Sequence, residues 1–259
     1  MIYLAILSAN QEPYQTEART LIDLYRSVTD SRVVTVFEYV GGTDRVYMEN
    51  NTLHLPCDDT DTIDKQEMMY RWFLDMEDAR WLIKTNTATV VNLHKIIQEL
   101  PQMRQDIIHC GFPLYITLDD IRYEYPMGNF NMIHRSTVEN IVDIMGKIHH
   151  TLPDFRFPRI TTDDVHLGAV ARFAGISTGM LRSYSMQKRL RMMMASNSAD
   201  RLTKEVYSAY VKIQPDTEGP NGEWGLCNDP DAIRDIRMWY EPEIIRMLFD
   251  LFYQSRPTS

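Results

Sequence analysis

Cysteine is scarce in this chain, and its pattern excludes two classes of small stabilised domain. The three cysteines, Cys57, Cys110 and Cys227, are isolated from one another and form no C-x-x-C pair. A disulfide framework or a structural zinc site needs several cysteines at short, regular spacings. Neither is indicated, and a reducing compartment is the simpler inference.

Basic charge and long apolar runs are also lacking. The formal net charge of -9 would repel the phosphate backbone of a nucleic acid, so we expect no unspecific nucleic-acid binding. The apolar run Ile2–Leu7 is much shorter than the roughly 20 residues of a membrane-spanning helix, and it lacks the basic flank of a signal peptide. We therefore expect no membrane association and, if Met1 is the natural start, a cytoplasmic protein.

The stretch Trp81–Leu93 is the one around which the rest of the chain is organised. An apolar, partly β-branched run predicts a buried strand, small polar residues at 85–88 break it, and a helical pattern begins at Asn92. In open α/β sheets, ligands lie beyond the carboxyl ends of such strands, and helix N-termini favour anions. This pattern predicts a site for a phosphate-bearing ligand, with an ordinary strand-to-helix turn as the alternative.

The remaining pattern predicts an α/β fold, in which a mixed sheet is flanked by helices. Strands are expected at residues 2–7, 33–40 and 114–118, and helices at 18–25, at 65–76 and from Ser136. A strand, a helix and a strand in succession favour a parallel pair with a right-handed crossover. This domain is expected to span residues 1–180. A mainly helical part, residues 181–259, is expected to pack on the same domain.

Two groups of carboxylates stand at predicted helix starts. One is the acidic loop at residues 58–61, before the helix at 65–76. The other is the pair Asp163 and Asp164, at the start of an Ala/Gly-rich helix that Gly175 ends. Carboxylates in such positions often cap the helix and interact with its dipole. A metal site in the first group and a catalytic role for the second are the functional alternatives.

Three segments, in a consistent order and spacing, match motifs of one known family. Lys65 with Arg71–Trp72, then Ile83–Thr85 and Val90–Asn92, match a K-x5-R-W helix and a K-T-D-D-D-V-F-V-N strand and loop; Tyr125–Arg135 matches Y-P-x-x-x-G-G-G-Y-V-M-S-R loosely; and Thr162–Gly168 matches E/D-D-V-x-x-G. As a set, these segments resemble the β-1,3-galactosyltransferase and fringe family of nucleotide-sugar-dependent glycosyltransferases. The resemblance covers about residues 1–180.

The resemblance implies a GT-A-type nucleotide-binding fold and an inverting transfer of a sugar from a UDP-sugar to a hydroxyl of a glycan acceptor. It makes Asp164 the base that takes the acceptor proton and Asp163 its neighbour, whose like charge would raise one pKa towards the working pH. Donor binding is assigned to Ser8, Ala9, Asn10, Lys65, Lys84, Thr85, Asn86 and Thr87. Acceptor binding is assigned to Tyr125, Gly128, Asn129 and Trp224, the last with loop anchoring as its alternative.

One departure from the family concerns the metal. Where the family carries Asp-x-Asp, this chain has Asn86, Thr87 and Ala88, and its last histidine is His166, too early to match the family's late metal ligand. Mg²⁺ and Mn²⁺ prefer anionic oxygen ligands, so we expect no conventional metal site. The diphosphate charge would then be balanced by Lys84, by the backbone N–H groups of residues 85–89 and by the basic run Lys188, Arg189 and Arg191. A solvated helix face is the alternative for that run.

A second reading of the chain remains open beside the enzyme. It could be a non-catalytic sugar-nucleotide or glycan-binding protein that kept the fold and lost its metal motif, although the retained pair Asp163 and Asp164 favours catalysis. An unrelated α/β hydrolase or phosphatase is disfavoured, because we expect neither the G-x-S-x-G motif of the first nor the C-x5-R motif of the second. The Golgi members of the family carry a membrane anchor; because we expect none here, we expect a bacterial or viral cytosolic enzyme.

Overall fold

The computed structural model describes residues 1–27, 32–87, 89–110, 113–118, 120–126, 130–151, 162–180, 186–189, 210–214 and 246. The chain divides into two compact units. The first is made of Met1–Asn10, Asp30–Asn86 and Gln102–Tyr184, and the second of Gln11–Thr29, Thr87–Pro101 and Ser185–Ser259. The division at residue 180 expected from the sequence stays a prediction. The second unit differs from the expected C-terminal part in that it also includes two earlier segments of the chain.

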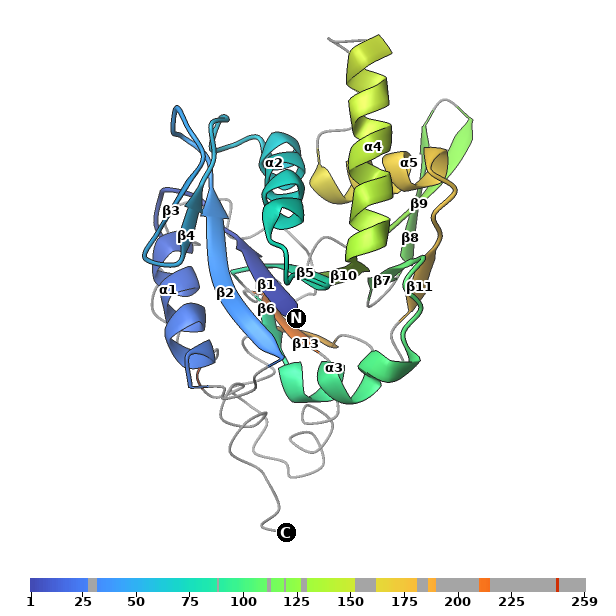
Figure 1. Ribbon diagram of the computed structural model, residues 1–259. Coiled ribbons are helices and arrows are strands. Elements are labelled where there is room, and N and C mark those ends of the chain that lie inside the picture. The colour runs from blue at the N-terminus through green and yellow to red at the C-terminus, as the bar shows by residue number, and fades with distance from the viewer. Residues whose placement is uncertain are drawn as a thin grey trace, which may run out of the picture. The chain divides into compact units, whose positions relative to one another are not determined.

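An eight-stranded mixed sheet forms the first unit, with the strand order β11-β7-β10-β5-β1-β2-β4-β3 (Figure 1). Its strands are β1 (Ile2–Leu7), β2 (Val33–Val40), β3 (Tyr47–Glu49), β4 (Thr52–His54), β5 (Trp81–Asn86), β7 (Ile108–Cys110), β10 (Phe130–His134) and β11 (Thr178–Met180). β1 lies centrally and pairs in parallel with both β2 and β5, which confirms the parallel arrangement expected from the sequence. β10 runs antiparallel to β5. The expected mixed α/β sheet is therefore confirmed.

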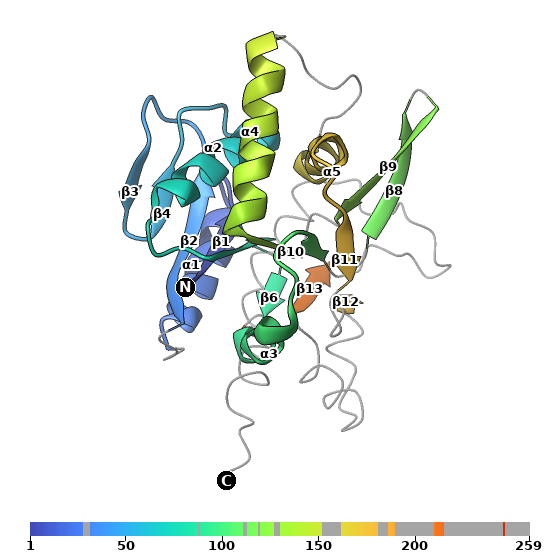
Figure 2. The same cartoon turned by 45° about the vertical axis from the view of Figure 1, so that its right-hand side comes forward.

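Three helices cover one face of this sheet (Figures 1 and 2). They are α2 (Thr62–Asp75), α4 (Arg135–Thr151) and α5 (Asp163–Phe173), and they pack against one another. The core between helices and sheet includes Tyr3, Phe73 and Leu82, all buried. Each such side chain stabilises the fold by roughly 1.5–3 kcal/mol.

Arg135 closes the C-terminal end of α2. Its guanidinium donates hydrogen bonds to the carbonyl oxygen of Met76, at 2.7 Å, and to that of Leu74. The last carbonyls of a helix have no partner within the helix, so the first residue of α4 supplies donors for them. The two helices are joined at this corner by polar bonds as well as by apolar packing.

A separate antiparallel hairpin lies beside α5 (Figure 2). It consists of β8 (Pro113–Leu118) and β9 (Ile121–Pro126), which form a two-stranded sheet of their own. The strand predicted at 114–118 is confirmed, although it lies outside the main sheet. α5 packs closely on β9 because Gly168 has no side chain: an added Cβ would clash with Tyr125 and lie 2.5 Å from the carbonyl oxygen of Glu124.

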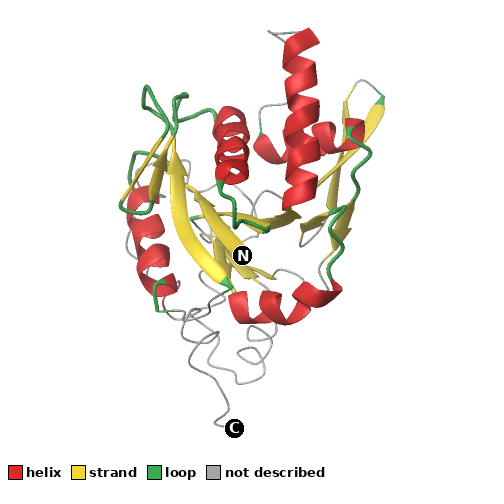
Figure 3. Cartoon of the chain, in the orientation of Figure 1, coloured by secondary structure: helices red, strands yellow, loops and turns green. Residues whose placement is uncertain are grey.

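The second unit contains α1 (Tyr14–Tyr25), α3 (Leu93–Glu99), which the short 3-10 helix Leu100–Gln102 follows, and a three-stranded sheet in the order β12-β13-β6. Its strands are β6 (Thr89–Val91), β12 (Met186–Arg189) and β13 (Tyr210–Gln214). The Tyr25 hydroxyl accepts a hydrogen bond from the Val91 amide at 2.7 Å and donates one to the Val91 carbonyl, so it holds α1 against β6. Figure 3 distinguishes the helices from the strands.

The helical stretch predicted around Lys188 and Arg189 is wrong at these residues, which lie in β12. Lys, Arg and Met are good helix formers, but pairing with β13 overrides that local preference. The helix expected at 243–253 falls outside the described residues except for Arg246, which is helical. In the described part of the chain, no helix combines the length and the apolar character that a bilayer span requires.

The contact between α5 and β9 gives a matched pair of glycine variants. Gly168→Ala should lower the free energy of unfolding by about 1–3 kcal/mol, because its methyl group overpacks the contact. Gly146→Ala, inside α4 with nothing within 4 Å of the added Cβ, should raise stability by up to about 1 kcal/mol. Urea denaturation measures both values. Equal effects of the two variants would contradict the close packing at Gly168.

Candidate functional site

The carboxyl ends of three parallel strands meet at one edge of the main sheet. Leu7, at the end of β1, pairs with Tyr39 of β2 and with Asn86 of β5. The structure thus brings together the loop at residues 8–10 and the end of β5, both of which the sequence assigned to the donor. This edge is where open α/β sheets bind ligands.

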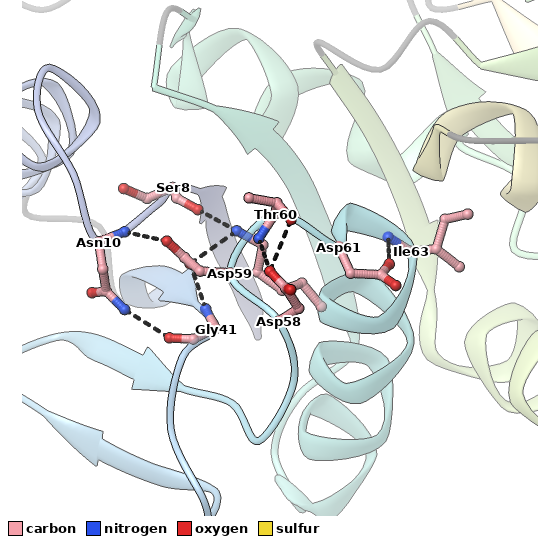
Figure 4. Close-up of polar contacts among 9 residues, drawn as sticks. Ser8, Asn10, Gly41, Asp58, Asp59, Thr60, Asp61 and Ile63 are labelled. Atoms are coloured by element: carbon pink, nitrogen blue, oxygen red, sulfur yellow. Dashed lines mark hydrogen bonds and ion pairs between the residues drawn. The ribbon is translucent and has the colours of Figure 1, made fainter.

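Asp59 organises the loops at this edge (Figure 4). Its carboxylate accepts hydrogen bonds from the Asn10 amide at 2.6 Å and from the Gly41 amide at 2.8 Å. It also pairs with the ammonium group of Lys65 at 3.2 Å, and the same ammonium donates to the Ser8 carbonyl at 2.8 Å. One carboxylate and one ammonium therefore hold together the segments that follow β1 and β2 and the first turn of α2.

The backbone leaves little freedom around this network. A Cβ on Gly41 would lie 2.8 Å from backbone atoms of residues 57–59, so only glycine fits there. Asn10 donates its side-chain amide to the Gly41 carbonyl at 2.7 Å. Lys65 is only 1% exposed, so its ammonium group lies beneath the loop. There it contacts the Ser8 carbonyl and the Asp59 carboxylate.

The other carboxylates of the acidic loop have local roles. Asp61 caps α2 by accepting from the amides of Ile63 and Asp64, as the capping interpretation of the loop predicts. Asp58 accepts from the amide and hydroxyl of Thr60 within one turn. Among the described residues, no three His, Cys, Asp or Glu side chains are grouped as metal ligands.

Lys84 and Asp163 form an ion pair inside the first unit. Lys84 points from the centre of β5 and is 0% exposed, and Asp163 opens α5 and is 7% exposed. Burying a lysine charge without a partner would cost several kcal/mol, so the carboxylate of α5 is what permits a lysine at this core position. The sequence predicts that the negative charge of Asp163 acts on the neighbouring Asp164. In the structure, Asp163 pairs with the ammonium group of Lys84.

Further polar groups surround this ion pair. Asn131 lies directly opposite Lys84 across the β10–β5 pair, and it is 0% exposed. Its side-chain amide, like the Tyr39 hydroxyl, has no hydrogen-bond partner among the described residues. Burial, followed by the charge of Asp163, holds the pKa of Tyr39 well above its usual value. A polar cluster thus lies beneath the helices, close to the edge where the parallel strands end.

Asp164 stands next to this buried pair and reaches the surface. Its side chain is half-buried and accepts a hydrogen bond from the Val165 amide at 2.9 Å, which places it at the N-terminus of α5. Burial, and then the negative charge of Asp164, raise the pKa of Tyr125. Asp164 is therefore close to the one predicted acceptor residue that the structure describes.

The side chains at the end of β5 do not provide the ligands of a conventional divalent-metal site. In place of two carboxylates they offer the amide of Asn86 and the hydroxyl of Thr87. That hydroxyl already donates to the buried Glu17 within the second unit. Thr85 and Thr87, both assigned to donor binding, are 1% and 2% exposed.

Several predicted site residues lie outside the described structure. Gly128, Asn129, Arg191 and Trp224 are among them. Lys188 and Arg189 are described only as part of strand β12. Their assignments to donor or acceptor binding stay predictions.

The segment Gly175–Gly179 has the letters of the G-x-S-x-G motif of α/β hydrolases, so the expectation that the chain lacks this motif is wrong. In that motif the serine sits on a turn from a strand into a helix. Here the order is reversed, since α5 precedes the segment and β11 begins within it, at Thr178. Gly175 has a φ of 68° and ends α5, as the sequence predicts, so the segment is a helix end rather than a nucleophile turn.

Removal of the Lys84 charge should expose the dependence of the core on the ion pair. Lys84→Met leaves Asp163 buried without its partner and should cost about 3–5 kcal/mol of unfolding free energy. Lys84→Met with Asp163→Leu should recover a large part of that loss. Lys147→Met, which breaks an exposed pair within α4, should cost less than about 0.5 kcal/mol. Urea denaturation of the four proteins checks the pair, and a single variant as stable as the control would refute it.

Removal of the Asp59 carboxylate should loosen the loops at the sheet edge. In Asp59→Ala, the amides of Asn10 and Gly41 lose their acceptor, so hydrogen exchange there should accelerate about tenfold or more. Asp58→Ala removes only bonds to Thr60 and should leave both amides unchanged. Exchange measured by NMR tests this, and unchanged protection in Asp59→Ala would show that the loops are held by other contacts.

Comparisons with known proteins were made at the level of sequence and of structure. No protein-family model and no curated protein matches the sequence. Solved structures similar to this chain include a glycosyltransferase involved in the glycosylation of the major capsid of PBCV-1, at 13% identity and a TM-score of 0.48. The alignment covers 94% of this chain and 98% of that one. At this identity, no residue of that protein is carried over to this chain.

Proposed function

We propose that the protein is an inverting glycosyltransferase that moves a sugar from a UDP-sugar to a hydroxyl of a glycan acceptor. The observation that carries the proposal is the ion pair between Lys84 and Asp163. These residues belong to two of the three segments that resemble the fringe-like family, and they are 79 positions apart in the chain. Their contact holds the acidic start of α5 against β5, two residues before the end of that strand, and the proposed chemistry requires these two elements to lie together.

In this proposal, Asp164 is the general base. It takes the proton of the acceptor hydroxyl as that oxygen attacks the anomeric carbon, and the bond to the diphosphate breaks on the opposite face. Asp163 does not exchange this proton, because it is paired with Lys84 inside the core. The pair acts as an anchor that fixes the first turn of α5, and with it the carboxylate of Asp164, relative to the sheet.

The departing diphosphate requires positive partners. The ammonium groups of Lys65 and Lys84 are engaged by Asp59 and Asp163, so we assign both lysines to positioning rather than to direct charge neutralisation. The basic run Lys188, Arg189 and Arg191 is then the proposed source of positive charge.

Charge removal at these three residues should weaken binding of UDP, and an unchanged affinity for UDP would exclude them as partners of the diphosphate.

A non-catalytic nucleotide-sugar or glycan-binding protein is the second candidate. The observation that favours it is the replacement of the family's metal-binding carboxylates by Asn86 and Thr87. The first candidate predicts sugar transfer that depends on Asp164. The second predicts ligand binding without any transfer. This difference can be measured directly.

The test is a panel of nucleotide sugars titrated by calorimetry, with Mn²⁺ or with EDTA, followed by assays of transfer and slow donor hydrolysis. One UDP-sugar should bind equally in both buffers. Asp164→Asn should keep that affinity within about twofold and lose at least about 10²-fold in turnover, the usual contribution of a general base. Asp143→Asn, an exposed carboxylate of α4, is the matched control and should keep full activity.

Each other result has a definite meaning. Binding only with Mn²⁺ would contradict metal independence. Donor binding without turnover in the wild type would favour the non-catalytic candidate. No nucleotide binding in either buffer would overturn the proposed function.

A further inference from the structure

A pocket in the first unit lies on the opposite half of α5 from the Lys84–Asp163 pair. It is an open pocket lined by the β8–β9 hairpin, the C-terminal half of α5 and the start of β11, and it has a volume of about 520 Å³. That volume falls within the range of about 300–1,000 Å³ found for small-molecule sites. Its polar lining includes Tyr115, Arg122, Glu124, Arg172, Ser177 and Thr178.

Two arginines give the pocket its charge. Arg172 donates to the carbonyl oxygen of Arg122 at 3.0 Å, and the guanidinium of Arg122 lies 3.9 Å from the centre of the Tyr115 ring. Neither arginine forms an ion pair with a carboxylate of the described residues. Both guanidinium groups therefore keep N–H donors for a ligand. A planar guanidinium favours two parallel hydrogen bonds to a carboxylate.

The rest of the lining suits a hydroxylated ring. Glu124 holds the Tyr115 hydroxyl, and this hydrogen bond and charge raise the pKa of Tyr115. The tyrosine remains 50% exposed, which leaves apolar ring surface for contact with a ligand. The hydroxyl oxygen of Thr178 is buried and has no hydrogen-bond partner among the described residues. One pocket thus combines unpaired cations, an exposed aromatic ring and hydroxyl-binding groups.

The pocket is aligned with the candidate base. Asp164, Gly168 and Arg172 follow one another at intervals of four residues, so they form a stripe on a single face of α5. Gly168 brings this face against Tyr125 and Glu124 of β9, and Arg172 reaches Arg122 further along the same strand. At a rise of 1.5 Å per residue, Asp164 and Arg172 are separated by roughly 12 Å along the helix axis. An extended oligosaccharide advances by less than half of this distance per unit, so the two positions are more than two sugar units apart along such a chain.

We propose that this pocket binds an acidic saccharide unit, a uronic acid, within the acceptor glycan. The assignment to the acceptor rests on the proposed transferase function. The carboxylate of the uronic acid is held by Arg122 and Arg172, and its ring lies against Tyr115 with its hydroxyls near Glu124 and Thr178. The chain carries a net charge of -9, so long-range attraction does not recruit such a ligand, and recognition depends on the two arginines.

The test uses methyl β-D-glucuronoside as the probe, with methyl β-D-glucoside and sodium sulfate as comparison ligands. Binding is followed by NMR titration of the wild-type protein and of Arg122→Gln and Arg172→Gln. Arg45→Gln is the matched control, because Arg45 also lies over a tyrosine, Tyr47, in a different hairpin of the same unit. UDP-sugar affinity and thermal unfolding are measured on the same samples.

We expect the glucuronoside to bind at least about tenfold more tightly than the glucoside, and each pocket variant to lose about tenfold or more. The control variant should bind as the wild type does, and all variants should keep UDP-sugar affinity. Equal binding of the glucoside would overturn recognition of the carboxylate, and equally tight sulfate binding would show an anion site without saccharide preference. UDP-sugar binding without glucuronoside binding would overturn this inference alone. Glucuronoside binding without any nucleotide-sugar binding would overturn its assignment to an acceptor.

Discussion

The buried ion pair between Lys84 and Asp163 is the interaction on which the first unit depends. It sets a charged lysine in the middle of a central strand, where an apolar side chain would be less costly. In return it fixes the start of α5 against β5, because Asp163, the first residue of α5, pairs with the ammonium group. The half-buried Asp164 takes its position from this arrangement.

The same device recurs at the edge of the sheet. Lys65 and Asp59 form a second ion pair with a nearly buried lysine, and its carboxylate also binds two backbone amides. Both pairs use charge where close packing alone would leave loops and helix ends without a defined position. In each case the ammonium group of the lysine is engaged by a carboxylate and is nearly or fully buried.

Much of the fold could be predicted from the sequence, because the strands at 2–7, 33–40 and 81–86 are apolar runs with clear boundaries. The contacts within the site could not be predicted in the same way. Asp58, Asp59 and Asp61 look equivalent in the sequence, yet one forms a turn, one joins three segments and one caps a helix, since tertiary position decides among them. The pairing of Lys84 with Asp163 was foreseen only as two separate motif residues. Lys188 and Arg189 were misassigned because strand pairing outweighed their helix preference.

The place of Asp163 in the chain has a consequence for the order of folding. β1, β2 and β5 are synthesised first and form the centre of the sheet, whereas α5 follows much later along the chain. Until that helix leaves the ribosome, Lys84 lacks the carboxylate of Asp163, with which it pairs in the finished structure. The partly made sheet therefore holds this lysine without the ion pair that anchors α5. Formation of this ion pair therefore awaits a residue that is synthesised 79 positions after the lysine.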